Sequence, residues 1–371
     1  MKEGFSFRSV FNPAVVRAFA ADLKRAWPEF NSRGFSRLIN SRIEDLNFGA
    51  RSDLITEALE RYLPDEYPRA VRILLDALGP ELDVPDLTGY DGFIIMPQTA
   101  YIARNGLEHY DLSMHALYEM TKRFSSEGAV RTFLRRYPER TLALFNTWVE
   151  NPNPHVRRLV SEGTRPRLPL ASRLNAFVDD PVPVIGLLEK LKADPELYVR
   201  RSVANNLNDI AKDNPDIVLA TLERWSVDAG DGTQWIIRHG LRTLLKQGHP
   251  RAFKLLGYGE SAAVRISHIA ICPTPVSLGD DAVLTLALVS EGSESQQLMI
   301  DYIVHYVKAN GARKPKVFKL AKKTLAPGEE VTLSKRLSFR PMTTRTYYPG
   351  RHRLDIQING SIIGGMEFDV V

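Results

Sequence analysis

Apolar residues recur at helical spacing through most of the first 257 residues of the chain. In the stretch 13–27, Val16, Phe19 and Leu23 fall on one face of a helix. An Asn-Pro pair at the start of this stretch is a typical helix cap. The segment 79–98 is rich in Gly and Pro and is predicted to be irregular. Similar amphipathic patterns predict helices over 35–47, 51–62, 66–78, 113–124, 128–136, 139–150, 154–162, 170–178, 184–192, 196–211, 215–226, 233–246 and 249–256.

The pattern changes to alternating and β-branched runs from residue 261 onward. Short runs of this kind, separated by Gly and Asn turn residues, predict a β-sandwich of the immunoglobulin-like type. It lacks a Cys pair and a core Trp, so it is not an antibody-type domain. We therefore expect a mainly α chain with two domains, 1–257 and 258–371. The predicted strands are 262–271, 282–289, 299–307, 330–339, 351–359 and 366–371.

A short motif repeats within the helical part. Val-Arg-Arg at 156–158 returns at 199–201, a shift of 43 residues, and a weaker third copy carries Arg238. An Asx-Pro pair precedes each of the first two copies, at Asn153 and Asp194, and is expected to cap the helix that follows. Repetition at about 40 residues is typical of stacked helix pairs of the HEAT type. The helical domain is therefore predicted to be an α-α superhelix of HEAT-like repeats.

Stacking such repeats would align their arginines along one surface, which suits a phosphate backbone. The alternative is that the arginines pair with neighbouring acids and only hold the stack together. Sequence leaves both readings open. The candidate phosphate contacts are Arg157, Arg158, Arg165, Arg167, Arg200, Arg201 and Arg238.

Charge adds to this picture only through its placement. The chain has 371 residues, 44% hydrophobic and 25% charged, with a formal net charge of +5, which is only weakly basic. The segment 308–324, however, contains seven Lys and Arg and no acid. Such a run is typical of a solvated loop or of a strand edge that resists aggregation. Beside an arginine-rich solenoid, a nucleic-acid contact through Lys314 and Lys316 is an equal competitor.

Several classes of protein are disfavoured. The single Cys272 excludes an intramolecular disulfide and is expected to be a small buried residue. The first 13 residues lack the apolar core of a signal peptide, and no uncharged run approaches 18 residues. We therefore expect a cytoplasmic protein with no membrane partner. The chain has no Walker loop, GxSxG elbow, GxGxxG after a strand, HExxH or zinc spacing, so neither a metal nor an organic cofactor is expected.

Three acids stand within basic stretches of the predicted helices. Glu162 follows the first Arg-Arg pair by one turn, Asp209 lies about two turns after Arg201, and Glu127 follows Lys122-Arg123. A carboxylate on a phosphate-binding surface disfavours DNA binding, so its presence requires a reason. One reason is a structural salt bridge to the adjacent arginines. The other is stabilisation of a positive charge in a substrate, or orientation of a water molecule.

Four segments resemble the AlkC branch of the HEAT-like-repeat DNA glycosylases, relatives of AlkD. The resemblance covers nearly the whole length and includes the C-terminal Ig-like domain that distinguishes AlkC proteins from AlkD. The SEGTRPRLP element is long and unusual, which makes the resemblance specific. The matching segments are TKRFSSE (121–127), HVRRLVSEGTRPRLP (155–169), RRSVANNLNDI (200–210) and YYPGRHRLDIQING (347–360).

The resemblance implies excision of N3-methylated adenine and cytosine from double-stranded DNA, without drawing the base into a deep pocket. The family's acidic site residues fall on Glu162 and Asp209, with Glu127 as a third. It also implies an Ig-like domain that grips DNA from the opposite side, and a monomer fits this arrangement. An N3-methylated base already carries positive charge, so its departure needs little general acid. A carboxylate beside the sugar would stabilise the oxocarbenium ion and orient water.

The sequence departs from the family pattern at two places. Position 170 is Leu where Trp is expected after RPRLP, and Gly128 replaces the aromatic residue expected after SSE. The loss of Trp removes a flat surface that could pack against the DNA backbone or the lesion, so the rate or the lesion range is expected to differ. Two rival functions follow: a non-catalytic DNA-binding or scaffold protein, and a solenoid that docks a protein partner.

Overall fold

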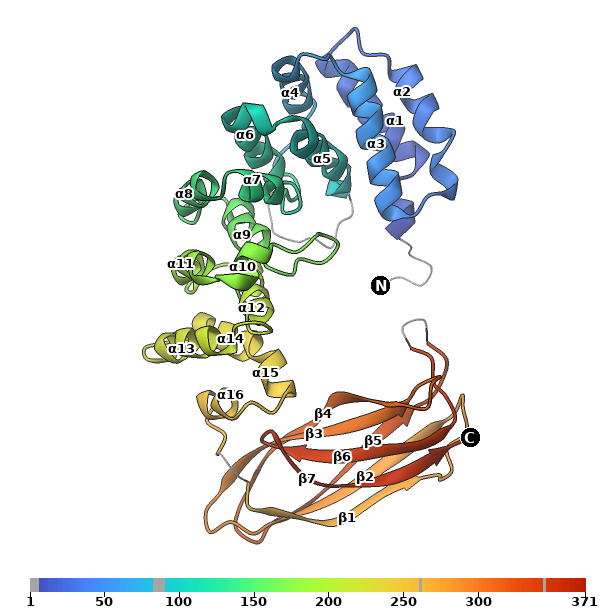
Figure 1. Cartoon of the computed structure of the whole chain (residues 1–371), viewed down its shortest axis with the longest axis vertical. Coiled ribbons are helices and arrows are strands. Elements are labelled where there is room, and N and C mark those ends of the chain that lie inside the picture. Colours follow the sequence, from blue (N-terminus) through green and yellow to red (C-terminus); the bar gives the residue numbers. More distant parts are fainter. Residues whose placement is uncertain (1–6, 83–90, 260–261, 343–344) are drawn as a thin grey trace. The chain divides into compact units, whose positions relative to one another are not determined.

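The computed structural model describes residues 7–82, 91–259, 262–342 and 345–371 (Figure 1). The predicted irregular segment 79–98 thus lies partly outside the described residues. Contacts divide the chain into two compact units. The first takes the residues up to Asn214 together with Val227–Gly240, and the second takes Pro215–Ser226 together with Leu241–Val371.

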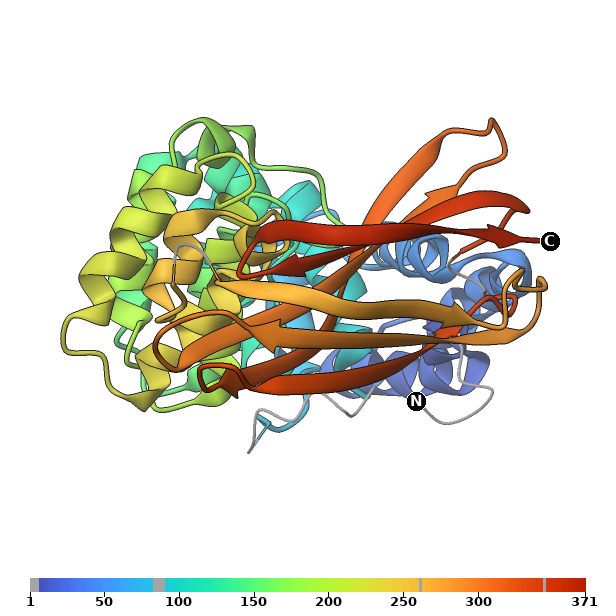
Figure 2. The ribbon, with the colours of Figure 1, turned by 90° about the horizontal axis from the view of Figure 1, so that it is seen from below.

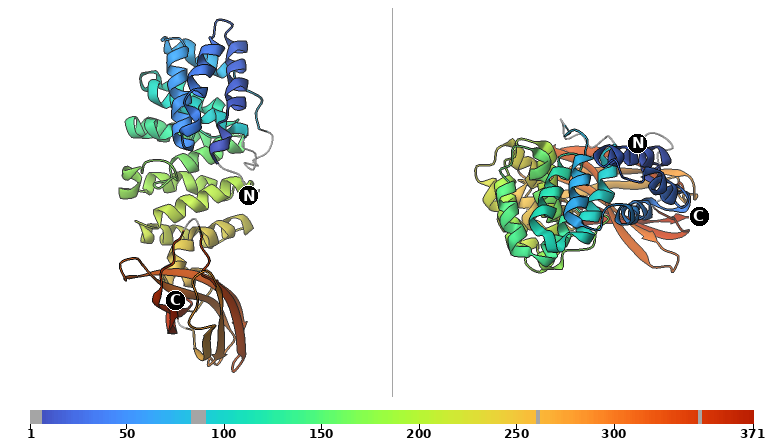
Figure 3. Two further views of the ribbon diagram at one scale, coloured as in Figure 1. Left: turned by 90° about the vertical axis from the view of Figure 1, so that its right-hand side faces the viewer. Right: turned by 90° about the horizontal axis from the view of Figure 1, so that it is seen from above.

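The first unit consists of helices that follow one another in layers (Figure 3). Helices α9 and α12 pack side by side, as do α12 and α14. Helices α8 and α11 form a second row beside α9 and α12, to their left in Figure 1. The bounds are α1 Pro13–Ala26, α2 Ser32–Asn40, α3 Phe48–Tyr62, α4 Tyr67–Asp76, α5 Ile95–Asn105, α6 Tyr110–Thr121, α7 Val130–Arg136, α8 Pro138–Trp148, α9 Pro154–Gly163, α10 Asn175–Asp179, α11 Val182–Leu191, α12 Leu197–Ile210 and α14 Asp231–Gly240.

The predicted helix starts are confirmed where Asn precedes Pro. The Asn12 side chain accepts hydrogen bonds from two backbone amides of α1, and Asn153 accepts one from the amide of His155. At the second repeat the cap differs from the prediction. Glu196 is the capping position of α12, and Asp194 instead accepts the Glu196 amide from two residues upstream.

Four parts of the helix prediction needed correction, and the first is the helix predicted at 35–47, which is α2 at Ser32–Asn40. Helix α5 was missed because Gly and Pro dominate the segment before it, although Pro97 stands in its first turn, where proline is tolerated. The helix predicted at 170–178 begins only at Asn175, since Leu170 has a left-handed φ of 60°. The helix predicted at 233–246 is two helices, α14 and α15.

The second unit joins three short helices to a β-sandwich. Its strands form two antiparallel sheets, ordered β1-β2-β5 and β4-β3-β6-β7, and run side by side along the sandwich (Figure 2). This confirms the predicted fold class, a helical part followed by an Ig-like sandwich. The bounds are α13 Pro215–Ser226, α15 Arg242–Lys246, α16 Pro250–Leu255, β1 Val264–Cys272, β2 Asp281–Ser290, β3 Gln296–Val307, β4 Arg313–Leu325, β5 Glu330–Ser338, β6 Gly350–Ile358 and β7 Ser361–Val370.

Alternation along the strands builds the core of the sandwich. Every second residue of β2, β3 and β6 is buried there: Leu284, Leu286, Leu288, Ile300, Tyr302, Val304, Leu354, Ile356 and Ile358. The lysine-rich segment 308–324 was predicted to be a loop or a strand edge, and most of it is the edge strand β4. Cys272 is exposed at the end of the edge strand β1, so the expectation that it is buried was wrong.

Within the second unit, the turn between α15 and α16 packs closely on the turn between β6 and β7. A Cβ atom on Gly248 would lie 2.5 Å from the carbonyl oxygen of Gly360, and one on Gly360 would lie 2.8 Å from Phe253. Both glycines also have positive φ angles. Helices α15 and α16 are therefore fixed to the sandwich. The sequence placed the domain boundary after them, at residue 257, because the pattern changes from helix to strand there.

Candidate active site

Two of the predicted acids lie at corresponding ends of neighbouring helices. Glu162 stands in the last turn of α9 and Asp209 in the last turn of α12. The two helices are tied together by Asn206, whose amide donates to the Ser161 carbonyl at 2.8 Å and to the Thr164 hydroxyl at 3.1 Å. The stacking of the repeats thus places both carboxylates beside one another.

Arginines join these acids to Glu127. Arg165 donates to Glu162 at 2.6 Å and to Asp209 at 2.7 and 2.8 Å. Arg158 donates to Glu127 at 2.9 Å and lies 3.7 Å from Glu162. A lysine ends the series, since the ammonium of Lys212 lies 2.7 Å from Asp209. We call this alternating series the charge row, and its members in order are Glu127, Arg158, Glu162, Arg165, Asp209 and Lys212.

The middle of the charge row is buried. Burial by itself would raise the pKa of Glu162, but Arg158 and Arg165 outweigh it and hold that pKa below its usual value. The other carboxylate oxygen of Glu162 accepts from the Ser202 hydroxyl at 2.5 Å. Both oxygens of Glu162 are therefore occupied, and this acid is an anion fixed in place.

The outer acid, Glu127, is more accessible. Its side chain is 29% exposed, and one carboxylate oxygen accepts from both Arg158 and the Ser125 hydroxyl. Arg158 also lies over the ring of Tyr198, 4.8 Å from the centroid. Burial opposes the charge of Arg158, yet Glu127 and Glu162 raise its pKa. Arg158 is thus a permanent cation held between two acids and an aromatic face.

A loop between α9 and α10 lies against the charge row and is held by Arg131. This fully buried side chain donates to the carbonyls of Gly163, Arg165 and Ser172, at 2.7–3.0 Å. Arg135 adds a bond to the Ser172 hydroxyl at 2.5 Å. Because both ends of the loop are fixed, its backbone has a defined course.

Leu170 stands at the tip of this loop. Its side chain is 93% exposed, the highest value among the large apolar residues of the described chain. Its φ of 60° is unfavourable for a residue with a Cβ. A held loop that presents an apolar side chain to solvent in this way is suited to contact a partner surface.

The repeated arginines show both of the roles that the sequence left open. Arg157 and Arg200, 43 residues apart, bind carbonyls at the start of their own helices, and Arg157 also binds Asp194 of the next repeat. Arg157 thus joins two repeats, as the alternative reading expected, whereas the bonds of Arg200 stay within its own repeat. Arg201 and Arg238 are exposed.

Arg158 and Arg165 belong to the charge row, and Arg167 makes two bonds to Asp213, with both side chains 24% exposed. The remaining predicted contacts, Lys314 and Lys316, lie in the second unit.

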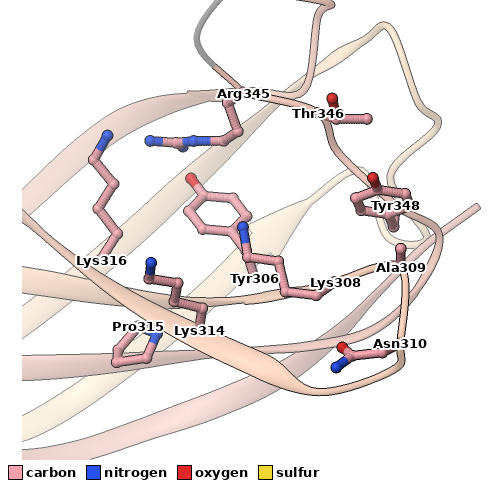
Figure 4. Close-up of a pocket in the computed structure, with 10 residues that line it drawn as sticks. All are labelled: Tyr306, Lys308, Ala309, Asn310, Lys314, Pro315, Lys316, Arg345, Thr346 and Tyr348. Atoms are coloured by element: carbon pink, nitrogen blue, oxygen red, sulfur yellow. The ribbon is translucent and has the colours of Figure 1, made fainter.

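The two predicted lysines line a cavity of about 810 Å³ on the β-sandwich (Figure 4). Their side chains and those of Lys308 and Arg345 stand around the ring of Tyr306 (Figure 4). The Arg345 guanidinium lies 4.5 Å from the centroid of this ring. None of the described residues that line the cavity is acidic. We call it the basic pocket, lined by Tyr306, Lys308, Ala309, Asn310, Lys314, Pro315, Lys316, Arg345, Thr346 and Tyr348.

Several side chains of the site were not predicted from the sequence, among them Arg131, Tyr198, Ser202 and Lys212. Lys212 had a visible signal, since it stands three residues after Asp209. Arg131 had none, because its contacts lie 32 to 41 residues away. Among the described residues no group of three or more His, Cys, Asp and Glu could hold a metal ion, and no helix there is long and apolar enough to cross a membrane.

Comparison with known proteins gives one match to the C-terminal domain and two matches over nearly the whole chain. A family model described as the C-terminal Ig-like domain of the uncharacterised protein YhaZ matches residues 265–371. The YhaZ protein of Bacillus subtilis is 35% identical over 366 residues, which cover 98% of this chain and 99% of YhaZ. The alkylpurine DNA glycosylase AlkC of Pseudomonas fluorescens, solved with DNA containing an abasic site analog, is 37% identical, with a TM-score of 0.91 over 99% of this chain and 100% of that one. The chain therefore belongs to the AlkC family of HEAT-like-repeat proteins with a C-terminal Ig-like domain.

Proposed function

We propose that this protein is a DNA glycosylase that releases cationic alkylated bases, 3-methyladenine and 3-methylcytosine, from duplex DNA. The observation that carries the proposal is the full-length similarity to AlkC, whose partner in its structure is DNA with an analog of an abasic site. An abasic site is the DNA product of base excision. The charge row supplies acids of the kind that such a reaction needs.

The chemistry is a hydrolysis at the sugar carbon C1′. The bond from C1′ to the base nitrogen breaks, its electron pair leaves with the base, and the positive charge of the methylated base is neutralised. The sugar becomes oxocarbenium-like, and water then attacks C1′ and gives up a proton. A fixed carboxylate next to C1′ stabilises this cation and orients the water. The leaving base needs no general acid because it departs neutral.

The three acids have different parts in this proposal. Glu162 is held on both oxygens and contributes a fixed negative charge. Glu127 lies at one end of the charge row, where a substrate could reach it, whereas Asp209 is buried and lies behind Lys212 at the other end. Arg158 and Arg165 hold the acids in place, as positioning residues, and they keep the pKa of Glu162 below its usual value. The base is acted on without being drawn into a deep pocket, as the family resemblance implies.

DNA contacts are proposed on both units. On the first, Arg167, Arg201 and Arg238 are accessible for phosphate contacts, whereas Arg157 joins two repeats and Arg200 is bonded to carbonyls within its own repeat. The exposed Leu170 is proposed to pack against the DNA in the place where the family has Trp. On the second unit, Lys314 and Lys316 of the basic pocket are proposed to bind the phosphate backbone.

One observation favours the rival function, a DNA-binding protein without catalysis. Each of the three acids is engaged by a cation, as structural salt bridges would be. Together with Leu170 and Gly128, this is what a repeat stack that has lost activity would show. Only a catalytic measurement separates the two functions.

The test is release of 3-methyladenine from methylated duplex DNA by the wild type, Glu162→Gln and Asp209→Asn. Asp213→Asn is the matched control, because Asp213 pairs with an arginine of the same loop outside the charge row. Release by the wild type and the control, lost in either acid variant that still binds DNA, supports the proposal. Salt-sensitive DNA binding with no release from any cationic lesion would establish the rival.

A further inference from the structure

The charge row has one cation that differs from the others. Arg165 is buried and holds two acids at once, and Arg158 is held by Glu127, Glu162 and an aromatic ring. Lys212 makes one bond, to Asp209, from a position just beyond the end of α12. Its side chain is 37% exposed whereas that of Asp209 is 3% exposed, so the ammonium lies on the solvent side of the pair.

The position of Lys212 matters because it decides the charge of the site. The charge row contains three acids and three cations, so its formal charge is zero. A site of zero charge has little attraction for a cationic base or for an oxocarbenium ion. One oxygen of Asp209 is fixed by Arg165, and the other is taken by Lys212. Asp209 can therefore face a cation only if Lys212 moves away.

The chemistry of lysine permits such a move. Its ammonium is a point charge on a flexible stem, unlike the planar guanidinium that two acids can clamp. A DNA phosphate is an alternative anion for it, and a solvent-facing lysine reaches one without disturbing the core. Loss of Lys212 from the row would leave a net charge of −1 on the remaining five residues.

We propose that Lys212 is an exchangeable positioning residue, which covers Asp209 in the free protein and transfers to a DNA phosphate in the complex. The phosphate of the bound strand thereby turns a neutral row into one that attracts a cation. This inference rests on the proposed function for its catalytic meaning, whereas the exchange itself concerns binding and can be measured on undamaged DNA.

The experiment is a double-mutant cycle on the affinity for an undamaged duplex, with Lys212→Met, Asp209→Asn and both together. Lys212→Met is expected to make the slope of log affinity against log salt shallower by about 0.9, the loss of one phosphate contact. Asp209→Asn is expected to strengthen binding by roughly threefold when Lys212 is present, because it releases the lysine. In the Lys212→Met background this gain is expected to disappear.

Matched variants separate this reading from a structural one. Lys192 also pairs with an acid three residues earlier, Glu189 at 2.5 Å, and its side chain is 38% exposed. Lys192→Met should leave the salt slope unchanged, and Lys212→Arg should keep it because the charge remains. An unchanged slope in Lys212→Met, or an equal gain from Asp209→Asn in both backgrounds, overturns the proposal. Base release by the wild type, measured in parallel, tests the glycosylase function separately.

Discussion

The charge row of the first unit and the basic pocket of the second use the same side chains in opposite ways. In the charge row each cation lies within ion-pair distance of an acid, and the formal charges cancel. In the basic pocket no described carboxylate lies within ion-pair distance of Lys308, Lys314 or Lys316, and burial together with Arg345 and Lys246 lowers the pKa of Lys316. In the proposed function the first arrangement holds anions for chemistry, whereas the second presents unneutralised positive charge.

The difference teaches that a count of arginines and lysines does not reveal their roles. A buried, paired cation stabilises the fold and orients its partner, whereas a cation with no acid nearby is available to a phosphate. The two regions should therefore respond differently when charge is removed. Loss of charge in the charge row should lower the stability and the rate of base release. Loss of charge in the basic pocket should lower only the affinity for DNA.

The largest expected effect is on stability, from Arg165→Met. The change leaves Glu162 and Asp209 buried beside one another without their shared cation, and should lower the free energy of unfolding by about 3–5 kcal/mol. Chemical denaturation followed by circular dichroism measures it. Arg167→Met is the control: it breaks a more exposed pair and should cost about 0–1 kcal/mol. Equal losses would show that burial of the charge row is not decisive.

The next effect is the response of Asp301 to pH. Burial raises the pKa of this β3 side chain from 3.8 to about 6. The folded chain therefore binds more protons than the unfolded chain between about pH 4 and 6. The free energy of unfolding consequently gains from the protonation of Asp301 as pH falls through that window. Asp301→Asn should raise the stability at pH 7 by roughly 1–3 kcal/mol.

Glu162 should respond in the opposite direction. Its lowered pKa gives a contribution to stability that is present above its unfolded pKa and is lost as pH falls through its folded pKa.

Thermal melts from pH 4 to pH 8 of the Asp301 variant and of the exposed control Asp369→Asn check the direction of the pH dependence assigned to Asp301. A stabilisation that does not depend on pH would contradict the assignment to Asp301.

Removal of charge from the basic pocket should have a moderate effect, confined to binding. Lys314→Ala with Lys316→Ala should make the slope of log affinity against log salt shallower by about 2. Fluorescence anisotropy with a labelled duplex at several salt concentrations measures it. Lys323 is exposed on the same strand outside the pocket, and Lys323→Ala is the control. The alternative, in which these lysines only protect a sheet edge, predicts no change of slope.

The smallest stability effect is expected at Leu170. Glycine relieves the left-handed φ but loses entropy on folding, so Leu170→Gly should raise the stability by about 0.5 kcal/mol or less. Base release should nevertheless fall, since the apolar side chain at the loop tip is gone. Thermal melts and the excision assay together test this. Unchanged excision would remove Leu170 from the proposed DNA contacts.

Much of the fold followed from local patterns in the sequence. The helices around the repeat and most strands were predicted because their apolar periodicity and Asn-Pro caps agree with the fold. The missed helix α5 and the late start of α10 have a different origin. Gly and Pro dominate the segment before α5 and conceal its start, whereas the late start of α10 depends on distant residues, since the loop before it is held by Arg131, at least 32 residues away in sequence.

The site was predicted less completely than the fold. Glu127, Glu162 and Asp209 were chosen because acids are unusual within basic helix faces, and the structure joins them through Arg158 and Arg165. Sequence could not decide which arginines face acids and which face solvent. Arg158 and Arg201 occupy the same position of the Val-Arg-Arg motif, yet one is bound to Glu127 and the other is exposed. The neighbouring segments, and not the motif, decide this.

The most direct test of the account compares the two regions in one assay, single-turnover release of 3-methyladenine over a range of protein concentrations. Asp209→Asn should lower the rate at saturating protein by about 10²-fold or more, as loss of a preorganised charge does. The Lys314→Ala, Lys316→Ala variant should keep the saturating rate near that of the wild type and raise the protein concentration needed for half of it. A normal saturating rate in Asp209→Asn, or a rate lost in the lysine variant even at saturation, would contradict the assignment of catalysis to the charge row and of DNA binding to the basic pocket.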